Sequence, residues 1–238
     1  MSSIAENIQT VRERMARAAL RSGRTAADIT LIAVTKTRTP AEMLEAVAAG
    51  ICDLGENKVQ ELEAKYDEVM GSIENQVTNF HFIGHLQRNK VKYIVGKTSL
   101  IHSVDSLRLA EEIDRKFGEA GERADVLIQV NAAREESKFG VTSDEASLLV
   151  TAIAERCANV RVKGLMCIAP AADDPDDVRE VFRSVKALFD DIASRQDERI
   201  RMEWLSMGMT HDYEVAIEEG ANLVRVGTGI FGARRVPA

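Results

Sequence analysis

Lys36 and Arg225 are the two charged residues of this chain that most need a chemical explanation. Lys36 ends the apolar run TLIAVTK, residues 30–36, where partial burial would favour the neutral amine that attacks a carbonyl. Arg225 lies inside LVRVG, and a buried guanidinium there needs an anion, a hydrogen-bond acceptor or a ligand. Both also have a structural interpretation, because a lysine can extend to solvent from a strand end and an arginine can pair with a core carboxylate.

Two segments rich in small residues have the composition of a phosphate site. SMGMT covers residues 206–210 and VGTG covers residues 226–229, and small residues let backbone N–H groups approach an anion. Thr210 precedes a predicted helix, whose N-terminal end favours negative charge. Residues 227–232 also spell G-x-G-x-x-G, but the sequence stops at residue 238, so we do not expect the βαβ unit of a dinucleotide site. Tight turns alone would explain one of the two segments.

The alternation of short apolar runs with amphipathic stretches predicts the scaffold that positions these residues. Such alternation indicates a parallel sheet, and several runs are continuously apolar, as strands covered on both faces should be. Eight units match a single (β/α)8 TIM barrel of the α/β class over residues 1–238, with an extra N-terminal helix that begins at a Ser3–Glu6 capping box. A doubly wound open sheet is the alternative. The expected strands are 30–36, 51–57, 79–85, 99–105, 124–131, 160–170, 201–208 and 222–231.

In such barrels the active site forms at the C-terminal ends of the strands. Polar or small residues gather at those ends in this sequence, and Lys138, in the loop after the fifth strand, is either a second amine near the mouth or a surface lysine. The candidates at the strand ends are Lys36, Glu56, Asn57, His85, Ser103, Asp105, Asn131, Met166, Cys167, Ser206, Gly208, Gly227 and Thr228.

Composition excludes several classes of function. The net charge is −7 with both signs interspersed, and aromatic residues make up 5% of the chain, so we expect no nucleic-acid surface. No apolar run is long enough to span a bilayer, and the charged N-terminus is not a signal peptide, so we expect a cytoplasmic protein. The three cysteines are expected to be buried, reduced thiols, and the four histidines form no metal-ligand pattern.

Seven motifs resemble those of one family and follow the order found there. The resemblance is to the pyridoxal phosphate homeostasis proteins, which are related to the fold-type III barrel of alanine racemase. It implies that pyridoxal 5′-phosphate is the cofactor. The motifs are AVTKT (33–37), LGENKVQE (54–61), FHFIGHLQRNK (80–90), SKFG (137–140), GLMCIAP (164–170), LSMGMTHD (205–212) and VRVGTGIFG (224–232).

The resemblance also implies how the two ends of the cofactor are held. Lys36 would form a Schiff base, Asn57 would lie beside the cofactor, and Arg225 would face the pyridine nitrogen. At the phosphate, the hydroxyl of Thr210 would stand where the family usually has serine. The remaining residues implied at the phosphate are Gly227 and Thr228, through their backbone amides, and Ser206 nearby.

The function implied by the resemblance is that of a carrier or regulator of pyridoxal phosphate, without robust catalysis. We expect a monomer, with apoenzymes that depend on the cofactor as partners. The alternative is a racemase-like enzyme acting on amino acids. An arginine at the pyridine nitrogen makes the cofactor a weaker electron sink. In alanine racemase a second domain supplies a catalytic tyrosine, and we expect no counterpart of that domain here. A Schiff-base aldolase would use the same lysine and phosphate site but lacks an evident second lysine on a neighbouring strand.

Overall fold

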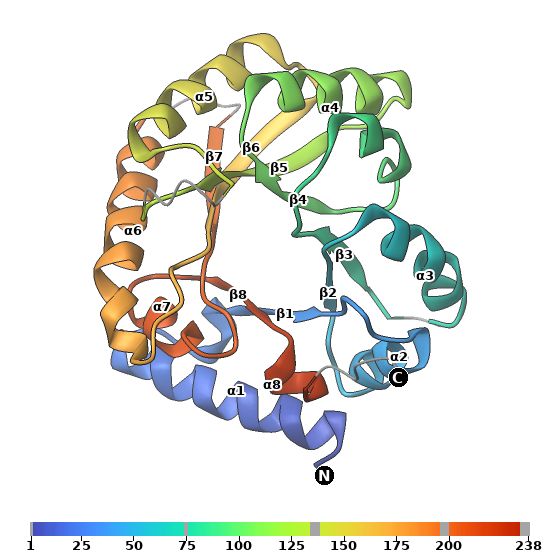
Figure 1. Ribbon diagram of the computed structural model, residues 1–238, viewed down its shortest axis with the longest axis vertical. Coiled ribbons are helices and arrows are strands. Elements are labelled where there is room, and N and C mark those ends of the chain that lie inside the picture. The colour runs from blue at the N-terminus through green and yellow to red at the C-terminus, as the bar shows by residue number, and fades with distance from the viewer. Residues whose placement is uncertain (1, 74–75, 134–138, 196–199, 234–238) are drawn as a thin grey trace.

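The computed structural model describes residues 2–73, 76–133, 139–195 and 200–233. Eight parallel strands pair in chain order, and β8 pairs with β1, which closes the barrel (Figure 1). The predicted (β/α)8 barrel is therefore confirmed, and the open sheet is excluded. The strands are β1 (Thr30–Val34), β2 (Asp53–Glu56), β3 (Asn79–Phe82), β4 (Leu100–Val104), β5 (Ala124–Val130), β6 (Val160–Cys167), β7 (Ile200–Ser206) and β8 (Leu223–Val226).

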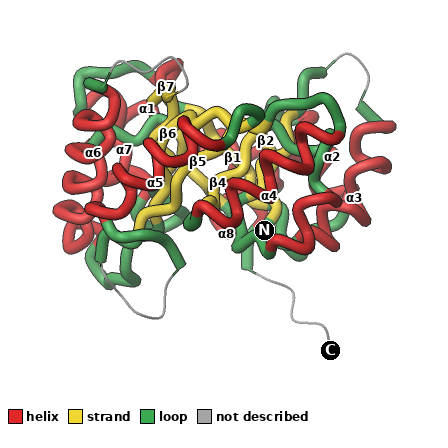
Figure 2. Tube along the Cα trace, turned by 90° about the horizontal axis from the view of Figure 1, so that it is seen from above, coloured by secondary structure: helices red, strands yellow, loops and turns green. Residues whose placement is uncertain are grey.

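The helices form the outer layer, and Figure 2 shows the strands between helices on either side. A 3-10 helix, η2 (Arg88–Tyr93), takes the place of an α-helix between β3 and β4. Two further 3-10 turns are η1 (Ala26–Asp28) and η3 (Pro175–Val178). The α-helices are α1 (Ile4–Arg21), α2 (Pro40–Ala48), α3 (Val59–Gly71), α4 (Leu107–Glu119), α5 (Ser143–Arg156), α6 (Arg179–Ala193), α7 (Tyr213–Glu218) and α8 (Thr228–Phe231).

Several helices begin where a side chain can accept from the free backbone amides of the first turn. At α1 the Ser3 hydroxyl accepts from the Glu6 N–H and the Glu6 carboxylate accepts from the Ser3 N–H, so the predicted capping box is present. The same reciprocal arrangement starts α2 and α5, and the Ser106 hydroxyl caps α4. Helix α1 then buries Ile8, Val11 and Met15 and packs against α7 and α8 (Figure 1).

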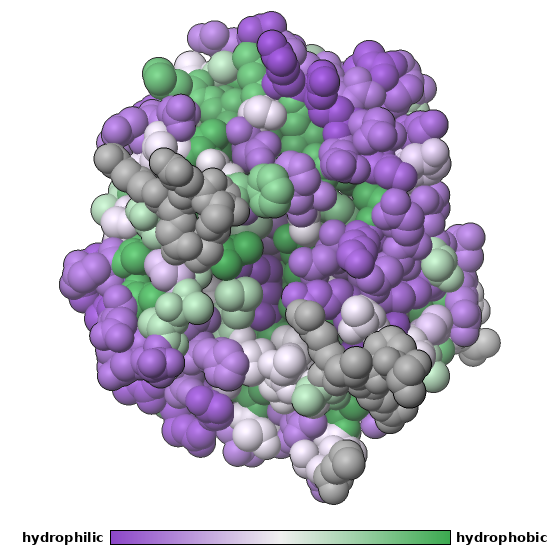
Figure 3. Space-filling view, in the orientation of Figure 1, coloured by the Kyte–Doolittle hydropathy of each residue, from purple (hydrophilic) through white to green (hydrophobic). Residues whose placement is uncertain are grey.

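The barrel interior contains an apolar cluster that is separate from the larger core between the sheet and the helices. It leaves little space, because a Cβ atom on Gly55 would lie 2.7 Å from Ile32 Cγ2 and 2.9 Å from Ile83 Cδ1. Only glycine fits at that point of β2. In Figure 3 most of the outer edge of the molecule is hydrophilic, as expected for helices that bury one face. The interior cluster consists of Ile32, Leu100, Leu127, Met166 and Leu223, with Trp204 packed against it.

The prediction that the eighth strand runs over residues 222–231 is wrong. β8 ends at Val226, and after Gly227 the chain forms the short helix α8. The apolar run misled the prediction because Ile230 and Phe231 are buried outside the sheet. Helix α8 lies against α1, where Asn7 Nδ2 donates to the Ile230 carbonyl at 2.8 Å. The remaining strands also end up to three residues earlier than expected, and Lys36 follows β1 instead of ending it.

The three cysteines do not share one environment. Cys157 and Cys167 are buried as expected, and burial raises the pKa of the Cys157 thiol to about 11. The expectation for Cys52 is wrong, because this residue is exposed and precedes the first residue of β2. No helix within the described ranges is both long and apolar enough to cross a membrane.

Candidate functional site

A cavity of about 280 Å³ lies at the C-terminal ends of β1, β2 and β8 and beside the loop after β7. Its volume is close to the lower end of the range for small-molecule sites, about 300 to 1,000 Å³. Ser206 does not line it but is fully buried and contacts one of the lining residues, Arg225. Six of the seven residues predicted to bind a cofactor line the cavity, namely Lys36, Asn57, Thr210, Arg225, Gly227 and Thr228.

Lys36 lies in the loop after β1 and is half-buried. Both of its neighbours in the chain are held by hydrogen bonds. The Thr35 hydroxyl donates to Glu56 Oε1 at 2.7 Å, and the Thr37 N–H donates to Glu61 Oε2 at 2.6 Å. Thr37 has φ 62°, a left-handed conformation that a β-branched residue rarely adopts. The Glu61 hydrogen bond fixes this conformation and with it the direction in which the chain leaves Lys36.

Lys65 connects these two glutamates, and we call Glu56, Glu61 and Lys65 the lysine-loop clamp. Lys65 Nζ lies 2.9 Å from Glu56 Oε1 and 2.9 Å from Glu61 Oε2, and it donates to the Thr35 carbonyl at 3.1 Å. Glu56 is fully buried and Lys65 is 8% exposed. The clamp lies on the outer side of the sheet, under α3. Glu56 was predicted at the rim; it instead supports the Lys36 segment from behind.

Burial dominates the electrostatics of Glu56. It raises the pKa of this carboxyl above its usual value, although the Thr35 hydroxyl and Lys65 act in the opposite direction. Its second oxygen, Oε2, has no hydrogen-bond partner in the described part of the chain. The pKa of Glu61 is lowered despite partial burial, because the Thr37 amide and Lys65 stabilise its charged form. The two carboxyl groups of the clamp are therefore shifted in opposite directions.

Arg225 is the third residue of β8 and is 4% exposed. Its Nη1 donates to Ser206 Oγ at 2.6 Å and its Nη2 donates to the Cys167 carbonyl at 2.9 Å. Burial lowers the pKa of the guanidinium, although nearby acidic groups act against that shift. No carboxylate within the described ranges forms an ion pair with it, so the alternative of a pair with a core carboxylate is wrong. The charge therefore faces a cavity without a counter-ion from this part of the protein.

The loops after β7 and β8 are joined to each other at the cavity. Thr210 Oγ1 accepts a hydrogen bond from the Gly229 N–H at 3.3 Å. The approach is close, because a Cβ atom on Gly229 would lie 2.9 Å from Val226 Cγ1. Gly227 has more room, since the nearest atom to its Cβ position is Val34 Cβ at 3.4 Å. The backbone amide of Thr228, the first residue of α8, has no acceptor within that helix, and Thr228 lines the cavity.

Asn57 contributes a polar atom that needs a partner. Its Oδ1 is buried and accepts no hydrogen bond from any residue that the structure describes. The side chain follows β2 directly and lines the cavity. Because an unsatisfied buried amide oxygen costs about 1 to 3 kcal/mol, a ligand that donates a hydrogen bond here would be stabilised by the site.

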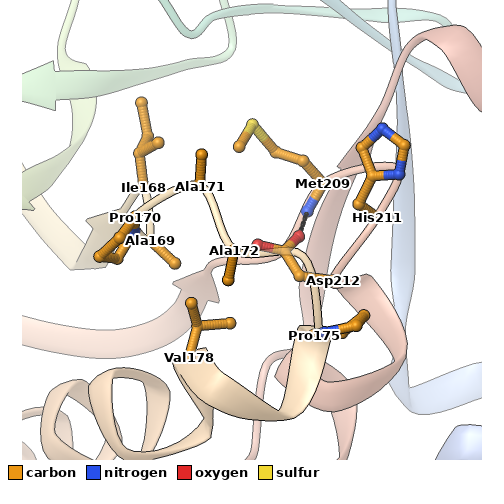
Figure 4. A pocket seen from close by; sticks show the side chains of 10 residues that line it. All are labelled: Ile168, Ala169, Pro170, Ala171, Ala172, Pro175, Val178, Met209, His211 and Asp212. Carbon is orange, nitrogen blue, oxygen red and sulfur yellow. Dashed lines mark hydrogen bonds between the residues drawn. The ribbon is translucent and has the colours of Figure 1, made fainter.

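A second, more apolar hollow of about 340 Å³ adjoins the cavity (Figure 4). Figure 4 shows its walls: the segment after β6, the residues of η3 and the loop after β7, where Asp212 accepts a hydrogen bond from the Met209 N–H. Ile168, Met209 and His211 line both spaces, so the two are continuous at their rims.

Of the lining residues that were not predicted, two carry polar side chains, Arg38 and His211, and the others are apolar, namely Val34, Ile83, Ile168 and Met209. Each of the two polar residues lies close in sequence to a predicted residue, because Arg38 is two residues after Lys36 and His211 is next to Thr210. Proximity in sequence to those residues was the available signal. Arg38 is held by the Gly232 carbonyl, at 2.7 Å from its Nη2.

The other rim candidates lie outside the cavity lining. His85 stacks on Phe139 with the ring centroids 3.9 Å apart, and its Nδ1 is 4.0 Å from Asp105 Oδ2. Met166 belongs to the interior apolar cluster, and Cys167 and Ser103 are buried. Gly208 supports the loop after β7 with φ 92°. Asn131 donates its backbone N–H to the Val141 carbonyl, and Lys138 falls outside the described residues.

Comparison with known proteins identifies the family. Residues 1–235 match the model of the alanine racemase N-terminal domain. The chain is 41% identical to the pyridoxal phosphate homeostasis protein of Aquifex aeolicus, over 97% of this chain and 98% of that protein. The chain belongs to the family of pyridoxal phosphate homeostasis proteins.

Other relatives agree with this assignment. The pyridoxal phosphate homeostasis protein of Escherichia coli is 38% identical over 98% of both chains. The solved structure of PipY from Synechococcus elongatus with PLP (pyridoxal phosphate) bound is 32% identical and superposes with a TM-score of 0.82. That match covers 97% of this chain and 100% of PipY. The family predicted from the sequence motifs is thus confirmed.

The clamp predicts an unusual pH dependence of stability. Replacing Lys65 by methionine leaves Glu56 buried without its cation, so we expect the free energy of unfolding to fall by about 3 kcal/mol or more at neutral pH. The pKa of Glu56 is raised in the folded state, so its protonated form stabilises the folded protein. That contribution is fully present at a pH below the ordinary pKa of 4.5 and is lost as the pH rises through the raised pKa. The variant should therefore be less impaired at pH 5 than at pH 8, as measured by urea unfolding.

A double variant, Lys65→Met with Glu56→Gln, is the control. It removes the titrating carboxyl, so it should regain part of the lost stability and lose most of the pH dependence of the single variant. Equal loss of stability at both pH values in the single variant would show that Glu56 does not carry the effect.

Proposed function

We propose that this chain binds pyridoxal 5′-phosphate as a Schiff base on Lys36 and acts in the intracellular homeostasis of that cofactor, as a carrier or regulator. The observation that carries the proposal is one cavity that combines a half-buried lysine, a buried arginine without a counter-ion in the described chain, and two joined small-residue loops. The relation to PipY, whose structure contains PLP, supports the choice of ligand.

The residues of the cavity suit the three chemically distinct parts of this cofactor. The neutral amine of Lys36 attacks the aldehyde carbon, and water leaves as the C=N bond forms. Thr210, Gly227 and Thr228 supply a hydroxyl and backbone N–H groups for the phosphate. Ser206 accepts a hydrogen bond from Arg225 and so supports that residue from below the cavity. Arg225 faces the pyridine nitrogen.

Asn57 completes the set of proposed contacts. Its unpartnered Oδ1 is available to a donor on the ligand side, where it would lie beside the cofactor. When bound, pyridoxal phosphate supplies a conjugated ring that can withdraw electrons from a bond next to the imine. This chain's own residues bind the cofactor, orient it and exclude water.

Arg225 favours a carrier over an efficient enzyme. Burial lowers the pKa of this guanidinium, but it remains a donor, so a pyridine nitrogen facing it accepts a hydrogen bond and does not carry a proton. A ring without that proton is a weaker electron sink. We propose no catalytic residue for this chain.

We extend the proposal to the protein's cellular role. It acts as a cytoplasmic monomer and delivers the cofactor to apoenzymes that depend on it. The cavity supports this role because it opens towards the more apolar hollow at the rim, which leaves a path for release. Light scattering at several protein concentrations tests the monomer, and transfer of colour to an added apoenzyme tests delivery.

Borohydride reduction should fix the cofactor on Lys36. Purified protein incubated with pyridoxal phosphate should be yellow, and reduction followed by peptide mass spectrometry should place the adduct on this lysine. Lys36→Ala should remain colourless while its circular dichroism stays native. Lys58→Ala, which removes an exposed lysine next to Asn57, is the matched control and should keep the colour. An adduct on Lys138, or none, would contradict the assignment.

The phosphate group should provide much of the affinity. Charge-assisted hydrogen bonds contribute about 1.5 to 3 kcal/mol each, so pyridoxal without phosphate should bind at least about tenfold more weakly. Thr210→Val should weaken the binding of pyridoxal phosphate, whereas Thr210→Ser keeps the hydroxyl and should bind normally. Gly227→Val should also weaken binding, because its side chain would crowd Val34, which lines the same cavity. Equal affinity for the two vitamers, measured by fluorescence titration, would place the anion site elsewhere.

Amino acids should undergo no rapid racemisation on the loaded protein. Racemisation needs proton transfer on both faces of the substrate, and among the lining residues only Lys36 and His211 are of a type suited to it. Single enantiomers incubated in deuterated water should show at most slow α-deuteration with retained configuration. Rapid loss of optical activity that both Lys36→Ala and His211→Gln abolish would establish a two-base enzyme and overturn the carrier proposal.

A further inference from the structure

A chain of hydrogen bonds crosses the inside of the barrel below the cavity. Arg225 Nη1 donates to Ser206 Oγ, which lies 3.0 Å from His102 Nδ1. His102 Nε2 lies 3.0 Å from His81 Nδ1, and His81 Nε2 lies 3.0 Å from Asp53 Oδ1. We call these five residues the interior hydrogen-bond chain. They come from β8, β7, β4, β3 and β2, and His81 and His102 are brought together although the sequence showed them as unrelated.

The two ends of this chain lie at opposite faces of the barrel. Arg225 lines the cavity at the C-terminal ends of the strands. Asp53 is the first residue of β2, and its side chain is 17% exposed. It lines a separate hollow of about 400 Å³ beside Arg12 and Cys52. His102 and Ser206, between the two ends, are fully buried.

The donors and acceptors of the chain allow one arrangement in which both imidazoles are neutral and Asp53 is ionised. An arginine only donates, so Ser206 Oγ accepts from Arg225, and the single hydroxyl proton is given to His102 Nδ1. His102 then carries its proton on Nε2 and donates to His81 Nδ1. His81 carries its proton on Nε2 and donates to the Asp53 carboxylate. Every hydrogen bond points towards Asp53.

One added proton at the Asp53 end permits the opposite arrangement. If His81 is protonated on both nitrogens, its Nδ1 donates to His102 Nε2. His102 must then carry its proton on Nδ1 and donate to Ser206 Oγ. The Ser206 hydroxyl then accepts from both His102 and Arg225 and keeps its own proton, which no longer points at His102. The two hydrogen bonds that link His81, His102 and Ser206 therefore reverse direction together. Arg225 then shares Ser206 Oγ with a second donor, His102.

The electrostatic surroundings disfavour a proton on either neighbour of His81, namely His102 and Asp53. Burial, with the nearby His81 and Arg225, holds the pKa of His102 well below its usual value. Burial opposes ionisation of Asp53, but its hydrogen bond and charge interaction with His81 bring the pKa of Asp53 below its usual value. Besides its own members, the titratable groups that act on these five residues are Cys167 and Asp212, both of which act on Arg225.

Filling a barrel interior with polar side chains such as those of the interior hydrogen-bond chain lowers stability. The interior cluster around it is apolar, and well-packed apolar residues are often as stable as buried polar groups or more so. The chain also satisfies each imidazole nitrogen, which indicates a specific arrangement. Asn79 adds to this, because its Nδ2 donates to Asp53 Oδ1 at 3.0 Å and fixes the terminal carboxylate.

We propose that Asp53, His81, His102 and Ser206 are positioning residues that couple protonation at the N-terminal face of the barrel to the hydrogen bonding of Arg225 in the cavity. The reversal of the chain changes how strongly Arg225 is bound to Ser206 and hence how it contacts the ligand. The coupling to pyridoxal phosphate rests on the proposed function. The two-state hydrogen-bond chain itself requires no ligand.

The ligand-free protein provides the first test. In protein labelled with 15N-histidine, nitrogen chemical shifts distinguish protonated from bare ring nitrogens. At neutral pH we expect His81 and His102 to be protonated on Nε2 alone. On acidification His102 should switch its proton to Nδ1 in the same transition in which His81 becomes doubly protonated. A His102 proton that stays on Nε2 while His81 titrates, or that begins on Nδ1, would overturn the proposal.

Two pairs of variants test the links. Asp53→Asn removes the charge that stabilises protonated His81, so the midpoint of the transition should fall by about one pH unit or more. Asp125→Asn is the matched control, since Asp125 is an aspartate near the start of β5 that pairs with Arg161. Ser206→Ala removes the acceptor for a proton on His102 Nδ1, so His102 should no longer switch its proton to that nitrogen on acidification. Ser103→Ala, which removes a buried hydroxyl with no partner among the described residues, should leave the switch intact. Equal effects within either pair would contradict the proposal.

The loaded protein tests the coupling. The visible absorption band of bound pyridoxal phosphate should shift with pH at the midpoint found for the His81 transition. That midpoint should move with Asp53→Asn but not with Asp125→Asn. A band that is indifferent to Asp53→Asn would refute the coupling while leaving cofactor binding intact. Absence of any bound cofactor, with the histidine transition as expected, would refute the proposed function and leave the two-state chain standing.

Discussion

The parallel pairing of β1 with β8 closes the sheet and places Ile32 beside Arg225. Through this pairing, the loop that carries Lys36 and the turn at Gly227 become neighbours, although they come from opposite ends of the sequence. Val34 at the end of β1 lies next to the Cβ position of Gly227, so the floor of the cavity is made by both strands. An open sheet with the same strands would separate these groups. The cavity is therefore a consequence of barrel closure.

Buried charges on the two sides of the sheet support the same site in different ways. Outside, the lysine-loop clamp holds the segment around Lys36 through an ammonium group shared by two carboxylates. Inside, Ser206 and the Cys167 carbonyl hold Arg225 without an opposite charge. The first arrangement fixes a backbone, and the second leaves a cation facing a cavity. A protein that retains both bears a cost in stability that an apolar core would avoid, which is typical of a binding site.

Local signals in the sequence were sufficient for much of the scaffold. Capping residues such as Ser3 and Ser106 marked where helices begin, and continuous apolar runs marked the strands. Prediction failed at β8 because Ile230 and Phe231 are as apolar as strand residues, yet they pack against α1. Exposure of Cys52 was likewise not readable, since it depends on where β2 begins.

The amino-acid order thus determined the succession of strands and helices, the barrel, and six residues that line one cavity, because periodicity and strand-end position are local properties. It left open the partners of Arg225. It did not reveal the clamp, since Lys65 reads as one more charge on an amphipathic helix. Nor did it connect His81 with His102, which face each other only inside a closed barrel. Partnerships between buried polar groups depend on which side chains converge in space, and that was decided by the tertiary structure alone.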